Sequence, residues 1–326
     1  FDNRGLYEAL KHSNKVLPIF IFDEKTLDKL PKKDARITFL LKALWGINKA
    51  MKGNKCAVGI YRGAPKAIFK KLTNDYEIDK VIANHDYEPY ALERDGEIKE
   101  LLEYKGIDFI TYKDQVIFEK DEICKNDGKP YLVYTPYSKK WIANLKPQDT
   151  NHYPSENNLG NLYNDSSLPT LTIADLGFES SEKEPLPHTF TDEVIDNYEA
   201  TRNFPMLDST SRLGAHLRFG TVSVRQLVEK AAVAKEITFL KELIWREFFM
   251  QILWHFPHTK DSNFKSKYDR IEWRNDEEDF KKWCAGETGY PFVDARMREL
   301  NETGFMHNRV RMLVGSFLCK HLLIDW

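Results

Sequence analysis

The stretch that decides the fold of this chain is residues 286–312, which read GETGYPFVDARMRELNETGFMHNRVRM. Its spacing predicts two helices joined by a tight turn. Pro291 suits the first turn of a helix, because its missing N–H has no partner to lose there. An apolar stripe at helical spacing follows, made of Val293, Met297 and Leu300. Gly304 then suits the left-handed residue that ends such a helix.

A second apolar run follows in the same stretch and begins near Phe305. Its inward positions also recur at helical spacing, and they are Val310, Leu313, Val314, Phe317 and Leu318. Polar and basic side chains crowd its first turn, namely His307, Asn308, Arg309 and Arg311. The first turn of a helix offers free N–H groups and the positive end of the helix dipole. We therefore expect this turn to suit phosphate or another anion.

The pattern TGYPxVDAxMRxLxxTGxMHNRxRM closely resembles the flavin-binding half of DNA photolyases, within the photolyase/cryptochrome family. The match is long and has no gaps. It covers nearly the whole chain, strongly from about Tyr198 onward and more loosely before. The resemblance implies an α/β N-terminal domain with a doubly wound parallel sheet, followed by an all-α FAD-binding domain.

The size and composition of the chain fit two soluble domains. A length of 326 residues exceeds the usual size of one domain, and 42% hydrophobic with 30% charged residues is typical of globular proteins. No segment resembles a signal peptide, and no apolar run is long enough to span a membrane. We therefore expect a cytoplasmic protein with no membrane partner.

The charge and the thiol pattern exclude two further classes of protein. A net charge of −2 argues against a protein that coats nucleic acid through a general basic excess, so any DNA contact must depend on a local basic patch. The cysteines lie far apart and form no CxxC pair; they are Cys56, Cys124, Cys284 and Cys319. The histidines show no HExxH spacing. The sequence therefore predicts neither a metal site nor a disulfide framework.

Both ends of the chain look truncated. It starts at Phe1 without a methionine and stops at Trp326 inside an apolar helical run, SFLCKHLLIDW. By resemblance, family members carry a strand before Asp2 and further helices after Trp326. The innermost tryptophan of the family's electron-transfer chain falls in that further segment. Loss of those helices would expose apolar faces on residues 315–326, so we expect poor solubility or weak flavin retention.

Residues 1–118 alternate strand-like and helix-like runs. Strands are expected at 16–22, 56–61, 81–84 and 107–112, and helices at 35–51, 64–72 and 90–104. Such alternation implies right-handed crossovers and a doubly wound parallel sheet. No GxGxxG or P-loop pattern occurs, so no motif supports a dinucleotide or nucleoside triphosphate site here.

The rest of the chain divides into a linker and a helical domain. Residues 119–190 are expected to form the interdomain linker, because the run NHYPSENNLGNLYNDSSLP has no periodicity and reads as exposed. Within it, residues 134–141 resemble a family segment that leads into a helix, so part of the linker should be packed. Residues 191–326 are expected to be helical, with helices at 192–201 and 237–256. By resemblance they form the FAD- and DNA-binding domain, incomplete at its C-terminus.

By resemblance, the N-terminal domain holds a light-harvesting antenna molecule, commonly a folate or a deazaflavin. Residues 87–95, YEPYALERD, align with the antenna region. Folate-type members have an Asn-Glu pair where this chain has Tyr90 and Ala91, which argues against a folate. The antenna is then another molecule or absent, and a plain helix start with Glu93 and Arg94 in solvent explains the segment equally well.

Residues 208–214, DSTSRLG, precede a short helix that runs on to Phe219. Consecutive hydroxyl side chains at a helix start offer donors for a pyrophosphate, although a plain helix cap uses the same residues. By resemblance, this segment holds the FAD phosphates through Thr210, Ser211, Arg212, Leu213 and Gly214. Gly214 stands where many members have Ser. Tyr198 matches an upstream tyrosine of the FAD site, and Arg202 matches a DNA-phosphate contact.

Residues 242–248, ELIWREF, form the next candidate group. Glu242 and Arg246 are four residues apart, a spacing that is also typical of an ordinary helix-face ion pair. An indole such as Trp245 can stack on a flipped-out base, worth about 1–3 kcal/mol per base, or simply pack in the core. By resemblance, Trp245 forms one wall of the lesion pocket and contacts DNA. Glu242 then hydrogen-bonds the damaged pyrimidines, and Arg246 lies on the flavin side.

The opening stretch supplies the remaining pocket residues by resemblance. Asn308 matches an asparagine near both flavin and lesion, Arg311 a flavin contact, Arg309 a DNA-phosphate contact, and Met312 a lesion-pocket residue. A basic side chain near the flavin ring would favour an anionic reduced flavin.

Two tryptophans match members of the family's electron-transfer chain. Trp273 corresponds to its outer member and Trp326 to its middle member, and these residues relay electrons to FAD in the family. Packing in the core is the alternative interpretation for both, and the sequence leaves it open.

Together the residues predict a class I cyclobutane pyrimidine dimer photolyase, a carbon–carbon lyase that acts on UV-damaged DNA as a monomer. The resemblance implies that excited reduced FAD donates an electron to a flipped-out dimer, the cyclobutane opens and the electron returns. (6-4) photolyases differ at His307 and Asn308, and DASH-type cryptochromes have Gln at Met312. Plant cryptochromes tend to lose Glu242 and Trp245.

Two alternative functions remain open. One is a cryptochrome-type blue-light photoreceptor, a flavoprotein without repair activity. The other is a helical DNA-binding module joined to a nucleotide-binding α/β domain, without flavin. Failure to bind FAD would favour the second alternative.

Overall fold

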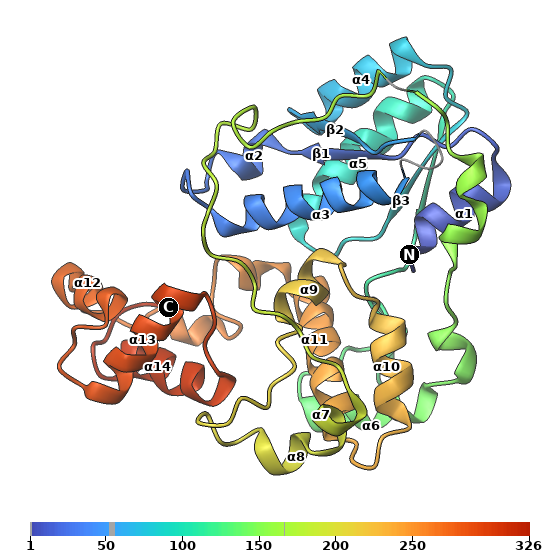
Figure 1. Ribbon diagram of the computed structural model, residues 1–326. Coiled ribbons are helices and arrows are strands. Elements are labelled where there is room, and N and C mark those ends of the chain that lie inside the picture. The colour runs from blue at the N-terminus through green and yellow to red at the C-terminus, as the bar shows by residue number, and fades with distance from the viewer. Residues whose placement is uncertain (1, 52–55, 166) are drawn as a thin grey trace. The chain divides into compact units, whose positions relative to one another are not determined.

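The computed structural model describes residues 2–51, 56–165 and 167–326 (Figure 1). The chain divides into two compact units that alternate along the sequence. The first consists of Phe1–Ser181, Phe219–Lys230 and Lys241–Pro257, and the second of Glu182–Arg218, Ala231–Leu240 and His258–Trp326. The predicted domains follow chain order, whereas two late helical segments belong to the first unit. Every helix among the described residues is too short or too polar to cross a lipid bilayer.

The first unit is built from alternating helices and strands, as the sequence predicts. Its strands are β1 (Ile19–Phe22), β2 (Gly59–Arg62), β3 (Lys80–Asn84) and β4 (Asp108–Tyr112). Its helices before residue 150 are α1 (Arg4–His12), α2 (Glu24–Leu27), α3 (Ala35–Met51), α4 (Pro65–Asp75), α5 (Pro89–Tyr104) and α6 (Tyr134–Asn144). Pro65 and Pro89 occupy first turns, where their missing N–H groups leave no helical hydrogen bond unmade.

The strands pair in parallel, but they do not join into the single sheet that we expected. β1 pairs with β2, with Ile19 opposite Gly59, and β3 pairs with β4, with Lys80 opposite Asp108. Within the described residues these are two separate two-stranded sheets. Alternating βα patterns predict which strands are linked by a crossover helix, but not which neighbouring pairs share a ladder. The doubly wound sheet is therefore corrected to two small parallel sheets.

Two apolar clusters hold the first unit together. The larger one surrounds β1, β2 and α3, with Leu41 and Ile60 almost fully buried. The smaller one joins α5 to β4 through Ile98, Leu102 and Ile107. Burial of such side chains contributes about 1.5–3 kcal/mol each. α4 and α5 lie side by side at this second cluster (Figure 1).

The predicted linker, residues 119–190, is packed in part, as expected, and most of its other residues are exposed or half-buried. Besides α6, it contains two 3₁₀ helices, Pro147–Thr150 and Ser155–Asn161. Tyr137 and Trp141 of α6 are buried, and so are Leu162 and Leu176 further on. A few apolar residues at irregular spacing anchor the segment here, and no periodicity marks them in the sequence.

A buried ion cluster fixes the start of the chain in the first unit. Arg225, in α10 (Val224–Ala232), donates from Nε to Asp2 Oδ2 and from Nη2 to Asp114 Oδ1, both at 2.9 Å. Burial alone would raise the pKa of Asp2. The hydrogen bonds from Arg225, Ser223 and Tyr153 outweigh it and hold that pKa below its usual range.

The second unit is helical apart from its loops. Its helices are α7 (Asp192–Asp196), α8 (Tyr198–Thr201), most of α9 (Gly214–Phe219), α12 (Glu277–Ala285), α13 (Pro291–Thr303) and α14 (Asn308–Lys320). The single helix expected at 192–201 is two short ones, separated at Asn197. α13 begins at Pro291 and ends at Gly304 with φ 72°, both as predicted. Its apolar stripe packs on α14 through Val293, Met297, Val310 and Val314.

The last helix is shorter than the sequence suggests. We expected α14 to begin near Phe305 and to continue to Trp326, but it begins at Asn308 and ends at Lys320. His307 accepts a hydrogen bond from Arg309 N and caps the start. At the other end Leu323 takes a positive φ of 53°, and its carbonyl accepts from Arg274 N at 2.8 Å. The chain after α14 is thus non-helical at Leu323 and bonded to a distant segment, although the apolar pattern continues.

Candidate functional site

In the first unit, Trp245 lies in α11 (Thr238–His255), the long helix that the sequence predicts. Tyr134 stacks on the indole with ring centroids 3.6 Å apart and an angle of 6° between the planes. Phe248 meets the same indole edge-on at 5.6 Å, and Phe249 lies 5.4 Å away. Trp245 is half-buried in this aromatic cluster.

Arg246 and Glu242 flank Trp245 on the same helix. Arg246 Nη1 donates to the carbonyl of Gln115 at 2.6 Å, which ties α11 to the segment after β4. The side chains of Glu242 and Arg246 are both partly exposed. The first unit therefore carries Glu242, Trp245 and Arg246 together on one helix, as predicted.

Glu247 is a site neighbour that the sequence reasoning missed. It is only 2% exposed, and its carboxylate accepts from Ile117 N at 2.5 Å, Phe118 N at 3.2 Å and Trp141 Nε1 at 2.6 Å. Burial raises the pKa of Glu247, and the three hydrogen bonds offset part of that rise. These bonds fix how α11 is rotated and hence where Trp245 and Arg246 point. Nothing in the local sequence separates Glu247 from Glu242, the other acid of α11.

In the second unit, residues 208–213, which are predicted to hold the FAD phosphates, form a loop before α9. Arg212 has a positive φ of 54°, and its Nη2 donates to Asp208 at 2.6 Å. The Ser211 carbonyl accepts from Thr189 N at 2.9 Å. The side chain of Leu213 is buried, so only its backbone is available to a ligand. Gly214 begins α9, and a Cβ there would meet open space.

The loop also holds polar atoms that suit an anionic cofactor. Ser209 Oγ and Arg212 Nε are buried and have no hydrogen-bond partner within the described part of the chain. Buried donors without partners are rare in folded proteins. A phosphate oxygen is the kind of acceptor that satisfies a hydroxyl and a guanidinium together. Thr210 and Ser211 lie beside them, so these residues fit the phosphates of FAD.

Tyr198 and Arg202 sit one turn apart at α8. The ring of Tyr198 meets Phe239 edge-on at 5.2 Å, and the Arg202 guanidinium lies 5.9 Å from the Tyr198 ring centre. Next along the chain, Asn203 Oδ1 accepts from Arg309 Nε at 2.7 Å. Arg202, the neighbour of Asn203, therefore lies in a segment that is bonded to Arg309. Arg202 and Arg309 are the two residues predicted to contact DNA phosphate.

The start of α14 presents the other predicted pocket residues. Asn308 is exposed and Met312 is 60% exposed, while Arg309 Nη1 lies 3.6 Å from the Met312 sulfur. Arg311 Nη2 donates to the carbonyl of Met306 at 3.3 Å. The Nδ1 atom of buried His307 accepts from Arg309 N, so the N–H of the neutral ring is on Nε2.

The segments that carry Trp273 and Trp326 are hydrogen-bonded to each other. Arg274 N donates to Leu323 O, and Asp325 N donates to Asn275 Oδ1, both at 2.8 Å. Trp273 is half-buried, whereas Trp326 is 66% exposed.

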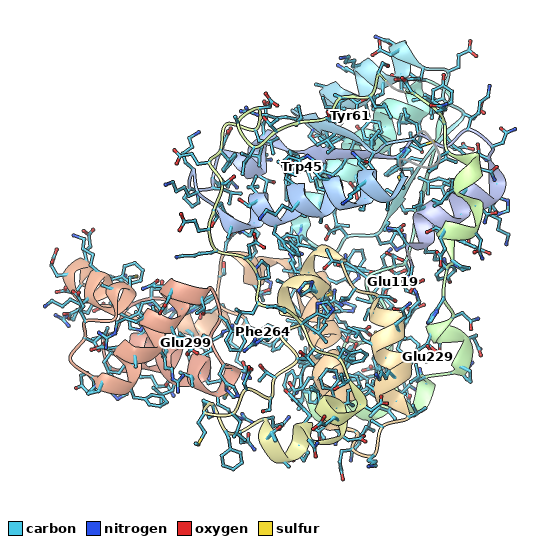
Figure 2. All side chains as sticks on the ribbon, viewed as in Figure 1. Trp45, Tyr61, Glu119, Glu229, Phe264 and Glu299 are labelled. Atoms are coloured by element: carbon cyan, nitrogen blue, oxygen red, sulfur yellow. The ribbon has the colours of Figure 1, made fainter. Side chains whose placement is uncertain are left out.

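The predicted antenna segment lies at the carboxyl ends of β1 and β3, the usual ligand-binding edge of parallel strands. The hydroxyl of Tyr90 donates to Asp23, and Lys25 Nζ lies 4.4 Å from the Tyr90 ring centre. Glu119, labelled in Figure 2, accepts from the Tyr87 hydroxyl at 2.5 Å and lies 2.7 Å from His85 Nδ1. This edge is thus already lined by aromatic and charged side chains.

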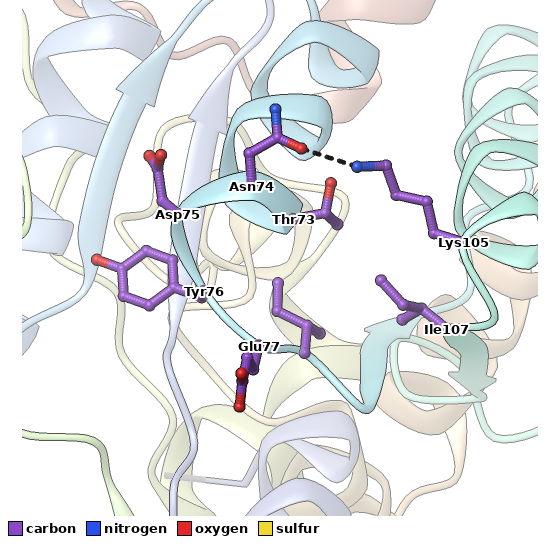
Figure 3. Close-up of a pocket in the computed structure, with 8 residues that line it drawn as sticks. Thr73, Asn74, Asp75, Tyr76, Glu77, Lys105 and Ile107 are labelled. Carbon is purple, nitrogen blue, oxygen red and sulfur yellow. Dashed lines mark hydrogen bonds between the residues drawn. The ribbon is translucent and has the colours of Figure 1, made fainter.

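A pocket of about 480 Å³ lies elsewhere in the first unit (Figure 3). Its lining comes from the connections that enter β3 and β4, and Lys105 Nζ donates to Asn74 Oδ1 across it at 2.9 Å. None of the predicted site residues lines it. It sits at the amino ends of the strands, opposite the usual ligand-binding edge.

Comparison with protein families and curated relatives agrees with these observations. The family model described as the FAD binding domain of DNA photolyase matches residues 239–326, and the DNA photolyase model matches residues 1–155. The deoxyribodipyrimidine photo-lyase of Synechococcus is 33% identical over all of this chain and 72% of its own length. That of Halobacterium salinarum is 33% identical over all of this chain and 74% of its own length.

Solved structures show the same likeness. A class III photolyase from Agrobacterium tumefaciens has a TM-score of 0.86 and 29% identity, over all of this chain and 71% of that one. An archaeal photolyase from Sulfolobus tokodaii with two FAD molecules has a TM-score of 0.82 and 28% identity, over all of this chain and 73% of that one. The photolyase fold, with an N-terminal domain and a helical FAD-binding domain, describes this chain. With one third of the residues identical over the full chain, this protein belongs to the DNA photolyase family.

Proposed function

We propose that this chain is a light-driven lyase that repairs cyclobutane pyrimidine dimers in DNA with FAD as its cofactor. The observation that carries the proposal is the loop 208–213, where Ser209 Oγ and Arg212 Nε are buried without a partner among the described residues. The family match over residues 239–326 supports FAD as the ligand. The class I subtype, a monomeric state and a cytoplasmic location stay predictions.

Several side chains and backbone groups would bind FAD. In the second unit, the cofactor would be held by Tyr198, Thr210, Ser211, Arg212, the backbone of Leu213 and Gly214, Asn308 and Arg311. Arg246, in the first unit, stays a predicted flavin contact. Arg212 is placed by its positive φ and by Asp208, so its guanidinium is oriented before the ligand arrives. Bound FAD supplies the light-driven electron transfer. Trp273 and Trp326 would pass electrons toward the flavin.

Two kinds of side chain would contact DNA: arginines that bind phosphate and pocket residues that contact the lesion. Arg202 and Arg309 would bind the phosphates that flank the lesion, as one local basic patch on a chain of net charge −2. In the first unit, Trp245 would stack on the flipped dimer and Glu242 would hydrogen-bond it. In the second unit, Asn308 and Met312 stay predicted lesion contacts. No acid–base pair is required of these residues, because the cofactor carries the chemistry.

The test begins with the absorption spectrum of the purified chain after incubation with FAD. We expect bound flavin that becomes reduced under blue light with a thiol donor. An Arg212→Ala variant should bind FAD about 10- to 100-fold more weakly, since a hydrogen bond to a charged group contributes about 1.5–3 kcal/mol. An Arg218→Ala variant, changed at an exposed arginine in α9, should bind it normally.

Repair is then measured on an oligonucleotide with one thymine dimer, in light and in darkness. Light-dependent restoration supports the lyase. Bound flavin without repair would favour a cryptochrome-type photoreceptor instead. A folded chain that never binds FAD would contradict the proposal and favour the flavin-free DNA-binding module.

A further inference from the structure

Three side chains with metal-binding atoms meet in the first unit, away from the residues discussed above. Asp121 and Cys124 lie between β4 and α6, and His255 is the last residue of α11. One carboxylate oxygen, the sulfur and one ring nitrogen all lie within 4.8 Å of one another. Among residues 2–51, 56–165 and 167–326, this is the one group of three that meets this criterion.

The distances are close to those of a tetrahedral zinc site. Zinc binds sulfur at about 2.3 Å and nitrogen or oxygen at about 2.0–2.2 Å, which places ligand atoms about 3.3–3.7 Å apart. His255 Nε2 is already 3.7 Å from Asp121 Oδ1. Because no pair exceeds 4.8 Å, shifts of about 1 Å close the remaining gaps.

The surroundings leave the nitrogen of His255 without a hydrogen bond. His255 Nε2 is buried and has no hydrogen-bond partner in the described part of the chain, and the side chain is 14% exposed. Asp121, in contrast, is 73% exposed, so an ion could enter from solvent. A divalent cation would displace the thiol proton of Cys124 and balance the thiolate and carboxylate charges.

Gln251 holds the loop that presents Cys124. It lies one turn before His255 on α11 and is 5% exposed. Its Nε2 donates to Ile123 O at 2.7 Å and lies 4.0 Å from Cys124 Sγ. Lys120, at the start of the loop, has a positive φ of 50°. These contacts hold the loop against α11, so Cys124 lies beside the face of α11 that carries Gln251 and His255.

We propose that Asp121, Cys124 and His255 bind a zinc ion, with water as the fourth ligand. Mixed thiolate, imidazole and carboxylate donors suit zinc, and three protein ligands leave one position open. The ion would join the segment after β4 to the end of α11. Its ligands Cys124 and His255 are 131 positions apart in the sequence. This departs from the sequence prediction of no metal, and it does not depend on the proposed repair activity.

The test uses cobalt, because Co²⁺ bound by a thiolate in a tetrahedral site absorbs at wavelengths longer than oxidised flavin does. The purified full chain is stripped with a chelator under reducing conditions and titrated with Co²⁺. We expect long-wavelength bands that saturate at one equivalent and disappear on addition of Zn²⁺. Cys124→Ser should remove or strongly weaken these long-wavelength bands, whereas Cys284→Ser should leave them unchanged.

Asp121→Asn is the variant least able to disturb folding, because the side chain is mostly exposed. It should bind Co²⁺ at least about 10-fold more weakly, the loss that even outer-shell changes cause. Absent bands in the unmodified chain, or bands that persist at full strength in Cys124→Ser, would overturn the proposal. Thermal unfolding of each variant checks that the chain is folded.

Discussion

The phenol ring of Tyr134 lies flat against the indole of Trp245, with ring centroids 3.6 Å apart. The Tyr134 hydroxyl also donates to the carbonyl of Lys241 at 2.6 Å, one turn before Trp245 on α11. Stacking and this hydrogen bond together hold the indole in one orientation. An aromatic surface that is already fixed loses less conformational entropy when a base stacks on it.

Replacing Trp245 with alanine should therefore weaken binding to damaged DNA selectively. Loss of one stacked base corresponds to about 1–3 kcal/mol, or roughly 5- to 150-fold in affinity. Fluorescence anisotropy with a dimer-containing and an undamaged oligonucleotide measures the effect. Affinity for undamaged DNA should change little, because phosphate contacts dominate there.

The matched control is Trp45→Ala, at a partly exposed tryptophan on α3 (Figure 2). It should leave both affinities unchanged. If Trp245→Ala weakens binding to both oligonucleotides equally, the indole does not read the lesion, and its role is structural.

Arg225 should be among the most sensitive positions for stability. Its side chain is 5% exposed and pairs with Asp2 and Asp114. Arg225→Met would leave two carboxylates without their cation, so we expect a loss of about 3–5 kcal/mol in the free energy of unfolding. Denaturant titration measures it. Lys113→Met, which breaks the more exposed pair with Glu122, should cost at most about 1 kcal/mol.

Two glycines beside α13 should differ in their tolerance of alanine. Both have a positive φ, 71° at Gly286 and 84° at Gly289, which disfavours alanine by about 1–2 kcal/mol. A Cβ at Gly286 would also lie 2.7 Å from the carbonyl oxygen of Asp294, whereas one at Gly289 meets nothing. Gly286→Ala should therefore be less stable than Gly289→Ala by a further ~1–3 kcal/mol. Equal thermal midpoints would contradict this.

Local patterns in the sequence predicted a helix well where residues within it or next to it determine its ends. The apolar periodicity of residues 35–51 gave α3 with both ends correct, and Pro291 with Gly304 gave both ends of α13. Where a distant segment decides, the pattern failed. α14 ends at Lys320, where the chain turns to bond with Arg274, and parts of residues 119–190 pack through scattered apolar side chains.

The candidate site shows the same division. The resemblance placed Glu242, Trp245 and Arg246 on one helix, and the structure has them there. It gave no hint of Glu247, whose partners Ile117, Phe118 and Trp141 lie more than 100 residues away. The group of Asp121, Cys124 and His255 was invisible for the same reason, because metal-binding motifs are recognised by short spacing.

Asp294 should make part of the stability of the second unit depend on acid pH. Burial alone would raise the pKa of Asp294, but hydrogen bonds from Thr288 and Gly289 outweigh it and hold that pKa below its usual range. Because the folded-state pKa is lowered, the stabilisation is present above the usual value of 3.8 and is lost as pH falls through the folded pKa.

Asp294→Asn should cost about 1–3 kcal/mol near neutral pH, since the amide cannot accept all three hydrogen bonds. Denaturant titrations at several pH values should show this cost shrinking below about pH 4, while Glu302→Gln, at an exposed position on the same helix, should show no such change. A cost that stays constant down to the acid unfolding of the chain would mean that packing around Asp294, and not its charge, holds the turn.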